Sequence, residues 1–272
     1  MTVKALKKQL MAAIAMVVVS AIALSSSTYA WFASNNKVEA TGLTIKAQSE
    51  AGILISHHED NDYKTSTSGI HTSAVALYPT STEKGSVWFH ASAQTTSAST
   101  AVEGSMKTLA LTEAGGIGAD GESKSYYIVD SFDIYTTGVA NNLVLDGVTV
   151  SNGSARAFNK SMRILLTCGT GDDAKAYVVA PNYEGTTNVS YTIGVNPDGN
   201  TAAGTTVTAY TPTNNKTNVL APSVSNNKAT PTVVKVYVYF EGEDTNHYTD
   251  NLTQIDDLGI TLTFAAEVVA GN

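Results

Sequence analysis

The sequence predicts an all-β protein that follows a hydrophobic N-terminal segment. Apolar and polar residues alternate in several stretches, which is the pattern of half-buried strands. The 272 residues include 13 Tyr and 21 Gly, a composition typical of strands joined by polar turns. No stretch after residue 32 has a long helical period. About ten short strands at irregular spacing indicate a jelly-roll-like antiparallel β-sandwich with long polar loops.

The first thirty residues have the three-part layout of a secretory signal. Three lysines lie within the first eight residues, and the uncharged apolar run Leu10–Leu24 follows them. Small residues come next and end at Ala30, so we predict a signal peptide over residues 1–30 that is cleaved between Ala30 and Trp31. A retained membrane helix is the alternative. Leu10–Leu24 is shorter than the ~20 residues that a bilayer requires, but extension through Phe32 would just span it.

The mature chain is acidic and has one cysteine. Removal of residues 1–30 takes away three lysines and no acidic residue, which changes the net charge from −8 to −11 and leaves 242 of the 272 residues. This charge argues against a nucleic-acid partner, because phosphate binding needs clustered Lys and Arg. Cys168 alone excludes an intramolecular disulfide and a multi-cysteine zinc site. We predict membrane contact only through the N-terminal segment.

The strands are predicted in one elaborated domain over residues 31–272. The clearest alternation runs from Val234 to Phe240, with Tyr237 and Tyr239 on the face opposite the valines. A second clear strand covers 258–266, and 162–168 places Cys168 on an apolar face as a small buried hydrophobe. Weaker candidates are 42–47, 53–56, 86–91, 126–135, 143–150, 174–180, 189–193 and 206–210.

Three exceptions interrupt this pattern. Gly147 lies inside its strand and predicts a bulge. Residues 108–113 are compatible with one helical turn. Residues 196–231 are rich in Thr, Asn, Gly and Pro and are predicted to be a polar loop or a spacer.

The sequence contains no recognisable set of catalytic residues. We therefore predict that the protein is not an enzyme and that it has no cofactor and no metal site. His57 and His58 belong to the densest group of possible metal ligands, but adjacent strand residues point to opposite faces. A solvated turn is the preferred reading there. Residues 241–244 (Glu-Gly-Glu-Asp) offer carboxylates that could hold calcium, and a charged turn is preferred. Serine is plentiful but never lies in a Gly-x-Ser-x-Gly elbow.

The two ends of the chain resemble a known family. The segments 28–32 (TYAWF), 38–47 (VEATGLTIKA) and 260–267 (ITLTFAAE) are similar to the processing site, first strand and closing strand of TasA/camelysin-type proteins. Members are secreted by Gram-positive bacteria and processed by a SipW-type signal peptidase. The resemblance covers about a quarter of the chain and implies a jelly-roll subunit of extracellular matrix fibres.

The resemblance also implies polymerisation by donor-strand exchange, in which the freed N-terminal segment of one subunit fills a sheet in the next. The residues assigned to this role are Trp31, Phe32, Val38, Ala40, Leu43 and Ile45. Gly42 could shift the register between the two anchor pairs. An ordinary first strand that pairs within its own subunit is an equal alternative.

The predicted function is therefore a secreted structural subunit of an extracellular fibre or biofilm matrix that associates with itself. Two alternatives remain. One is a pilin-like or membrane-anchored filament subunit that retains the N-terminal helix. The other is a carbohydrate- or host-binding adhesin with an exposed aromatic platform, for which Tyr237 and Tyr239 are candidates.

Overall fold

The fold comes from a computed structural model of the chain. It describes residues 16, 38–40, 43–49, 52–58, 60–72, 75–77, 80–86, 88–91, 106–108, 126–151, 161–169, 174–181, 188–192, 206–211, 216–242 and 259–269. The chain divides into two compact units, Met1–Asn36 and Lys37–Asn272. In the second unit nearly all the described residues lie in strands or turns, which confirms the all-β prediction.

The described strands are short except near the middle and at the end of the chain. They are β1 (Val38–Ala40), β2 (Leu43–Ser49), β3 (Ile53–His57), β4 (Ser66–Thr72), β5 (Val75–Leu77), β6 (Thr80–Ser81), β7 (Phe89–Ala91), β8 (Met106–Thr108), β9 (Tyr127–Thr136), β10 (Val139–Ser151), β11 (Met162–Cys168), β12 (Lys175–Val179), β13 (Val189–Thr192), β14 (Thr206–Tyr210), β15 (Val219–Val224), β16 (Thr232–Phe240) and β17 (Gly259–Val269).

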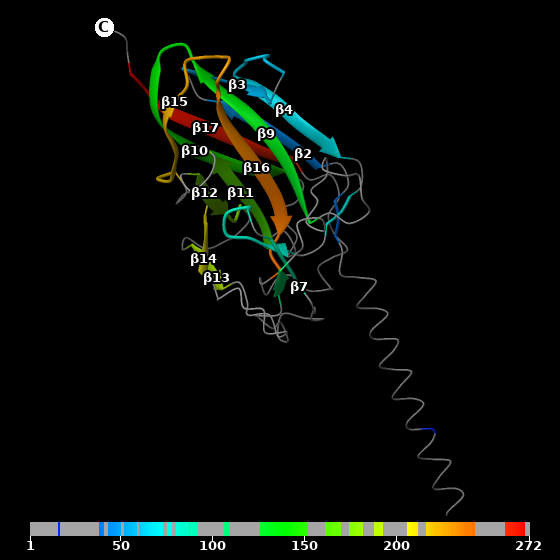
Figure 1. The fold of residues 1–272 in the computed structure, drawn as a ribbon. Helices are drawn as coiled ribbons and strands as arrows, with labels where there is room; N and C mark the ends of the chain where they lie inside the picture. Colours follow the sequence, from blue (N-terminus) through cyan, green and yellow to red (C-terminus); the bar gives the residue numbers. More distant parts are fainter. Residues whose placement is uncertain are drawn as a thin grey trace, which may run out of the picture. The chain divides into compact units, whose positions relative to one another are not determined.

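Two large sheets dominate the second unit. One has five strands in the order β15-β10-β17-β2-β4, and the other has seven in the order β13-β14-β12-β11-β16-β9-β3. In Figure 1 the red β17 and the blue β2 belong to the first sheet, and the green β9 and the orange β16 belong to the second. Two small sheets, β1-β5 and β6-β7-β8, complete the described strands.

Both large sheets are mixed, which corrects the prediction of a purely antiparallel sandwich. β2 runs parallel to β17, and β12 runs parallel to β14. Periodicity shows which residues share a face, but it does not show the direction of the neighbouring strand. The first and the last long strand of the chain are thereby neighbours in one sheet.

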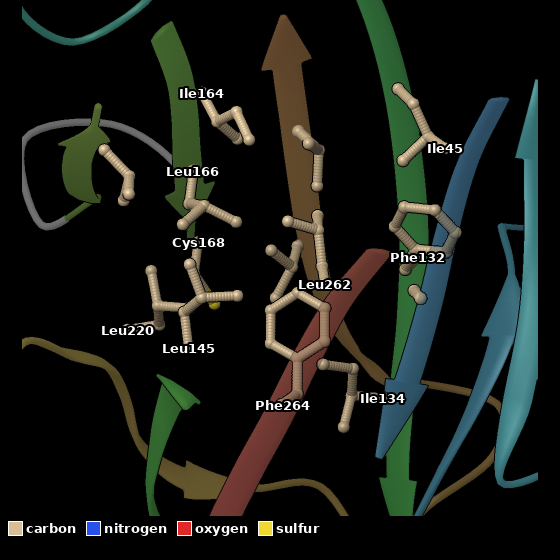
Figure 2. Packing of buried hydrophobic residues seen from close by; sticks show 14 of the residues in the cluster. Ile45, Phe132, Ile134, Leu145, Ile164, Leu166, Cys168, Leu220, Leu262 and Phe264 are labelled. Atoms are coloured by element: carbon tan, nitrogen blue, oxygen red, sulfur yellow. The ribbon is translucent and has the colours of Figure 1, made fainter. Parts of the chain in front are cut away.

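The core lies between the two large sheets. Phe264 and Leu262 of β17 point toward Ile164 and Leu166 of β11 and toward Phe132 of β9 (Figure 2). All five side chains are buried. A single apolar cluster therefore contains side chains from both sheets, and this shared core gives the fold its sandwich-like character.

Most of the predicted strands are confirmed within one to four residues at each end. β16 places Val234, Val236 and Val238 in the core, as its alternation predicts. Cys168 is buried in the same cluster, and burial raises the pKa of its thiol, so it behaves as a small hydrophobe. The register of β10 against β17 shifts between Leu145 and Gly147, which confirms the predicted bulge.

The stretch 196–231, predicted to be a polar loop or a spacer, contains two strands. β14 matches the strand candidate at 206–210, and its Val207 is buried in a second cluster. β15 was not predicted, because Pro and Ser interrupt its apolar positions, although Leu220 and Val224 are core residues. The helical turn considered at 108–113 falls almost wholly outside the described residues, and Thr108 itself ends β8.

Candidate functional site

The N-terminal strands are the first candidate site, and the structure divides them between two sheets. Val38 and Ala40 lie in β1, where they pair with Leu77 and Val75 of β5. Leu43 opens β2 and pairs with Thr72 of β4. The segment that the sequence suggested as one continuous donor strand is therefore two short strands in two sheets.

β2 occupies an interior position in the five-stranded sheet. It lies between β17, to which it is parallel, and β4, to which it is antiparallel. Ile45 and Ala47 are fully buried, whereas Lys46 between them is exposed. The described ladder of β4 is formed with β2 alone. β2 thus completes the core and also connects β4 to the rest of the sheet.

The residue that immediately precedes β3 is conformationally restricted. Gly52 precedes β3 with a φ of +101°, a region that side chains with a Cβ rarely adopt. A Cβ at this position would overlap Val268 near the end of β17. Thr136 Oγ1 donates a hydrogen bond to the Gly52 carbonyl oxygen at 2.9 Å. This turn is where the chain passes from the five-stranded sheet to the seven-stranded sheet.

The predicted cleavage site lies outside the described residues. This applies to Ala30, Trp31 and Phe32, and to all of residues 1–30 except Met16. Among the residues that the structure describes, no helix is long and apolar enough to cross a membrane.

Two buried residues of opposite charge are a feature that sequence reasoning missed. Glu241, expected in a solvated turn, is 0% exposed, and Ser81 Oγ donates a hydrogen bond to its Oε2 at 3.0 Å. Arg163 of β11 is also 0% exposed, and its guanidinium carbon lies 5.6 Å from the centre of the Tyr191 ring. The Tyr191 and Tyr239 hydroxyl oxygens are 3.5 Å apart.

Both charges act on the same two tyrosines. Burial, and after it the Glu241 carboxylate, raises the pKa of Tyr191 well above its ordinary value. The same causes in the same order raise the pKa of Tyr239, while Arg163 lowers the pKa of both hydroxyls.

The short β6 segment, which carries Ser81, is held against the end of β16 because the Gly242 amide donates a hydrogen bond to the Thr80 carbonyl oxygen at 3.1 Å.

The tyrosines suggested as an adhesin platform are largely covered. Trp88 stacks on Tyr127 with ring centroids 4.2 Å apart and meets Tyr239 edge-on at 5.3 Å. Tyr239 is fully buried, and Tyr237 is partly buried against the same cluster. These rings form a second apolar cluster outside the main core, so the predicted exposed platform is wrong for Tyr239, and Tyr237 is a packing residue.

His57 and His58 contact separate carboxylates. His57 Nε2 lies 2.9 Å from Asp130 Oδ1, and His58 Nδ1 lies 2.6 Å from Asp133 Oδ1. Both aspartates are buried, so these histidines belong to structural pairs as well as to a turn. Within the described part of the chain, no group of three or more His, Cys, Asp or Glu side chains is arranged to hold a metal ion.

The geometry defines an all-β unit in which two mixed sheets share one apolar core. Comparison of the chain with protein-family models, characterised proteins and solved structures finds no match.

Proposed function

We propose that this chain is a secreted structural subunit of an extracellular fibre or biofilm matrix, and that it assembles by exchange of its N-terminal strand between copies. The placement of β2 is the observation that carries this proposal. β2 is the first long strand, it is bonded on both sides, and it fills the core with Ile45 and Ala47. The resemblance of both chain ends to TasA/camelysin-type proteins supports the same function and a jelly-roll-like arrangement of the two sheets.

The physical basis is that exchange conserves the contacts of β2. A copy of β2 from a neighbouring subunit would form the same ladders with β17 and β4, and it would bury the same side chains. Burial of one isoleucine side chain contributes about 1.5–3 kcal/mol. The free-energy difference between the closed and exchanged forms then depends on protein concentration and on the conformation of Gly52, which precedes β3. Because β2 lies near the start of its unit, it can leave the sheet without unthreading later strands.

Paired cysteines distinguish the closed form from the exchanged form. Lys46 of β2 and Ser68 of β4 are opposite each other, and both are exposed. We propose Lys46→Cys with Ser68→Cys in a Cys168→Ala background, oxidised after assembly of residues 31–272 has been established by negative-stain electron microscopy. Exchange predicts covalent multimers on a non-reducing gel. Filaments that yield only internally crosslinked monomers would refute exchange.

A second cysteine pair provides the matched control. Thr149 of β10 and Thr261 of β17 are also opposite each other in the same sheet, but neither strand is exchanged. Thr149→Cys with Thr261→Cys should therefore give monomeric crosslinks in every state of assembly. Persistent absence of filaments at all concentrations would argue against a self-sufficient fibre subunit.

Processing is tested separately by the intact mass of the protein recovered from the expressing bacterium's medium. A mature chain that begins at Trp31 is expected for a secreted subunit. A mass that includes residues 1–30 would favour the membrane-anchored alternative.

A further inference from the structure

An open groove of about 190 Å³ lies between β12 and β14 in the seven-stranded sheet. Its lining combines tyrosine rings, threonine hydroxyls, small apolar side chains and one pair of charged residues. The lining residues are Glu83, Lys84, Ala176, Tyr177, Val178, Thr206, Val207, Thr208 and Tyr210.

The groove exists because two parallel strands diverge. β12 and β14 pair only at Val178 with Ala209 and at Val179 with Tyr210. Each strand is fully paired on its other side, β12 with β11 and β14 with β13. The ladder therefore stops about halfway along both strands, and their N-terminal halves leave a wedge-shaped opening in the sheet.

Backbone polar groups face this opening. The Ala180 amide donates a hydrogen bond to the Tyr210 carbonyl oxygen at 2.8 Å. Backbone groups alternate in direction along a strand with a period of two. The amide and carbonyl of Ala176 on β12, those of Thr206 on β14 and the Thr208 amide are thus directed toward the groove, whereas the Thr208 carbonyl belongs to the ladder with β12. Such groups require hydrogen-bond partners when a ligand displaces water from them.

The side chains add hydroxyls and a fixed aromatic ring. Tyr177 is held in place because its hydroxyl donates to the Val219 carbonyl oxygen at 3.1 Å, and its ring centroid lies 6.4 Å from that of Tyr210. Glu83 and Lys84 form an ion pair of 3.4 Å, so their charges cancel. The lining therefore carries no net charge.

We propose that this groove binds neutral carbohydrate, one or two sugar units in length. Sugar hydroxyls both donate and accept hydrogen bonds, which matches threonine and tyrosine hydroxyls and the outward backbone groups. The C–H faces of a sugar ring match the tyrosine rings of the lining. The groove volume of about 190 Å³ lies below the ~300–1,000 Å³ range of small-molecule sites, so only a short piece of a sugar chain fits inside it.

An extended polypeptide fits the groove less well. Strand addition requires a continuous free edge, but this opening is closed at one end by the pairs that begin at Val178 and Ala209. The carbohydrate inference is independent of assembly, since it concerns a groove on a sheet that does not contain β2.

The test is an NMR titration of ¹⁵N-labelled residues 31–272, kept monomeric at low concentration. The probes are cellobiose, maltose and N,N′-diacetylchitobiose at concentrations up to the order of 10 mM. At least one disaccharide should shift the amide signals of Ala176, Val207 and Thr208 with saturation. Thr208→Val and Tyr210→Ala should each weaken that binding at least about tenfold.

Tyr63→Ala is the matched control, because Tyr63 lies on the surface beside Tyr135 and is not among the groove residues. It should leave the affinity unchanged, and thermal melts of all three variants should show cooperative unfolding. If Tyr210→Ala fails to fold, Thr206→Val replaces it, since Thr206 is exposed.

Three results would overturn the inference. One is the absence of shifts with all three disaccharides, and another is a set of shifts that maps away from the groove. The third is saturable binding in the groove of a peptide covering residues 31–47, which would identify a polypeptide acceptor. Filament formation by the same protein is measured independently, so failure of either proposal leaves the other testable.

Discussion

Ile45 lies directly beside Ile260 in the parallel ladder that joins β2 to β17, and both side chains are buried in the same core. One residue belongs to the first long strand and the other to the last. Residues 44–49 and 259–264 are therefore adjacent in space. The strand exchange proposed above would take place in this sheet.

Replacement of Ile45 should have a large effect on stability. Because Ile45 is fully buried, Ile45→Ala removes buried apolar surface and leaves a cavity, and we expect a loss of about 2–5 kcal/mol in the free energy of unfolding. Lys46→Ala, one residue along the same strand on the exposed face, should change it by less than about 0.5 kcal/mol. Urea denaturation of monomeric protein measures both. Equal effects would mean that β2 is not packed in its own sheet in solution.

Gly69 of β4 is predicted to be essential for the packing of Asp130. A Cβ built at Gly69 would overlap the Asp130 carboxylate and come close to the Phe132 ring, so Gly69→Ala should destabilise the protein by about 1–3 kcal/mol. The carboxylate also contacts His57 Nε2 at 2.9 Å and accepts a hydrogen bond from the Ser131 amide.

A double-mutant cycle tests whether overlap with the Asp130 carboxylate is the reason that Gly69→Ala is destabilising. Asp130→Ala removes the group with which the new methyl would collide, so the cost of Gly69→Ala should be smaller in that background. Additive costs in the double variant would show that the collision with Asp130 is not the reason.

The effects of replacing Arg163 and Glu241 on the free energy of unfolding should depend on each other. Loss of one buried charge leaves the other in a low-dielectric environment without compensation, so Glu241→Ala and Arg163→Ala should each cost about 3–5 kcal/mol. The double variant should lose less than the sum, and chemical denaturation of all three variants measures this coupling. Fully additive losses would indicate that the two charges do not compensate each other. Ser81→Ala, which removes only the hydroxyl donor to the Glu241 carboxylate, should cost about 1.5–3 kcal/mol.

Stability should fall at alkaline pH because of Tyr191 and Tyr239. Their pKa values are raised in the folded protein above the ordinary value of 10.0, first by burial and then by Glu241. Above pH 10 the unfolded chain therefore loses these protons while the folded chain keeps them. Each tyrosine then lowers the free energy of unfolding by about 1.4 kcal/mol per pH unit.

Tyr239→Phe removes one of these contributions. Its stability should decline less steeply than that of the unmodified protein between about pH 10 and pH 11.5, by about 1.4 kcal/mol per pH unit. Urea denaturation across this range gives the slopes. Tyr210→Phe, at a half-exposed position in β14, is the control and should follow the unmodified protein. Parallel declines for all three proteins would contradict the assignment.

The sequence by itself determined the all-β class, most strand positions and the faces of the clearest strands. Alternation is a local property, so the valines of β16 and the apolar side of β11 could be read from spacing alone. The bulge at Gly147 followed from a glycine inside a strand. The same logic placed Cys168 among buried hydrophobes.

Only the tertiary structure decided which strands are neighbours and what lies over their faces. The parallel pairing of β2 with β17 joins residues from opposite ends of the chain, and no local pattern contains that information. Glu241 is buried against Ser81, which is 160 residues away in the sequence, so the local sequence resembled a charged turn. The cover of Trp88 over Tyr239 and the divergence of β12 from β14 have the same origin: they are set by contacts between segments that only folding brings together.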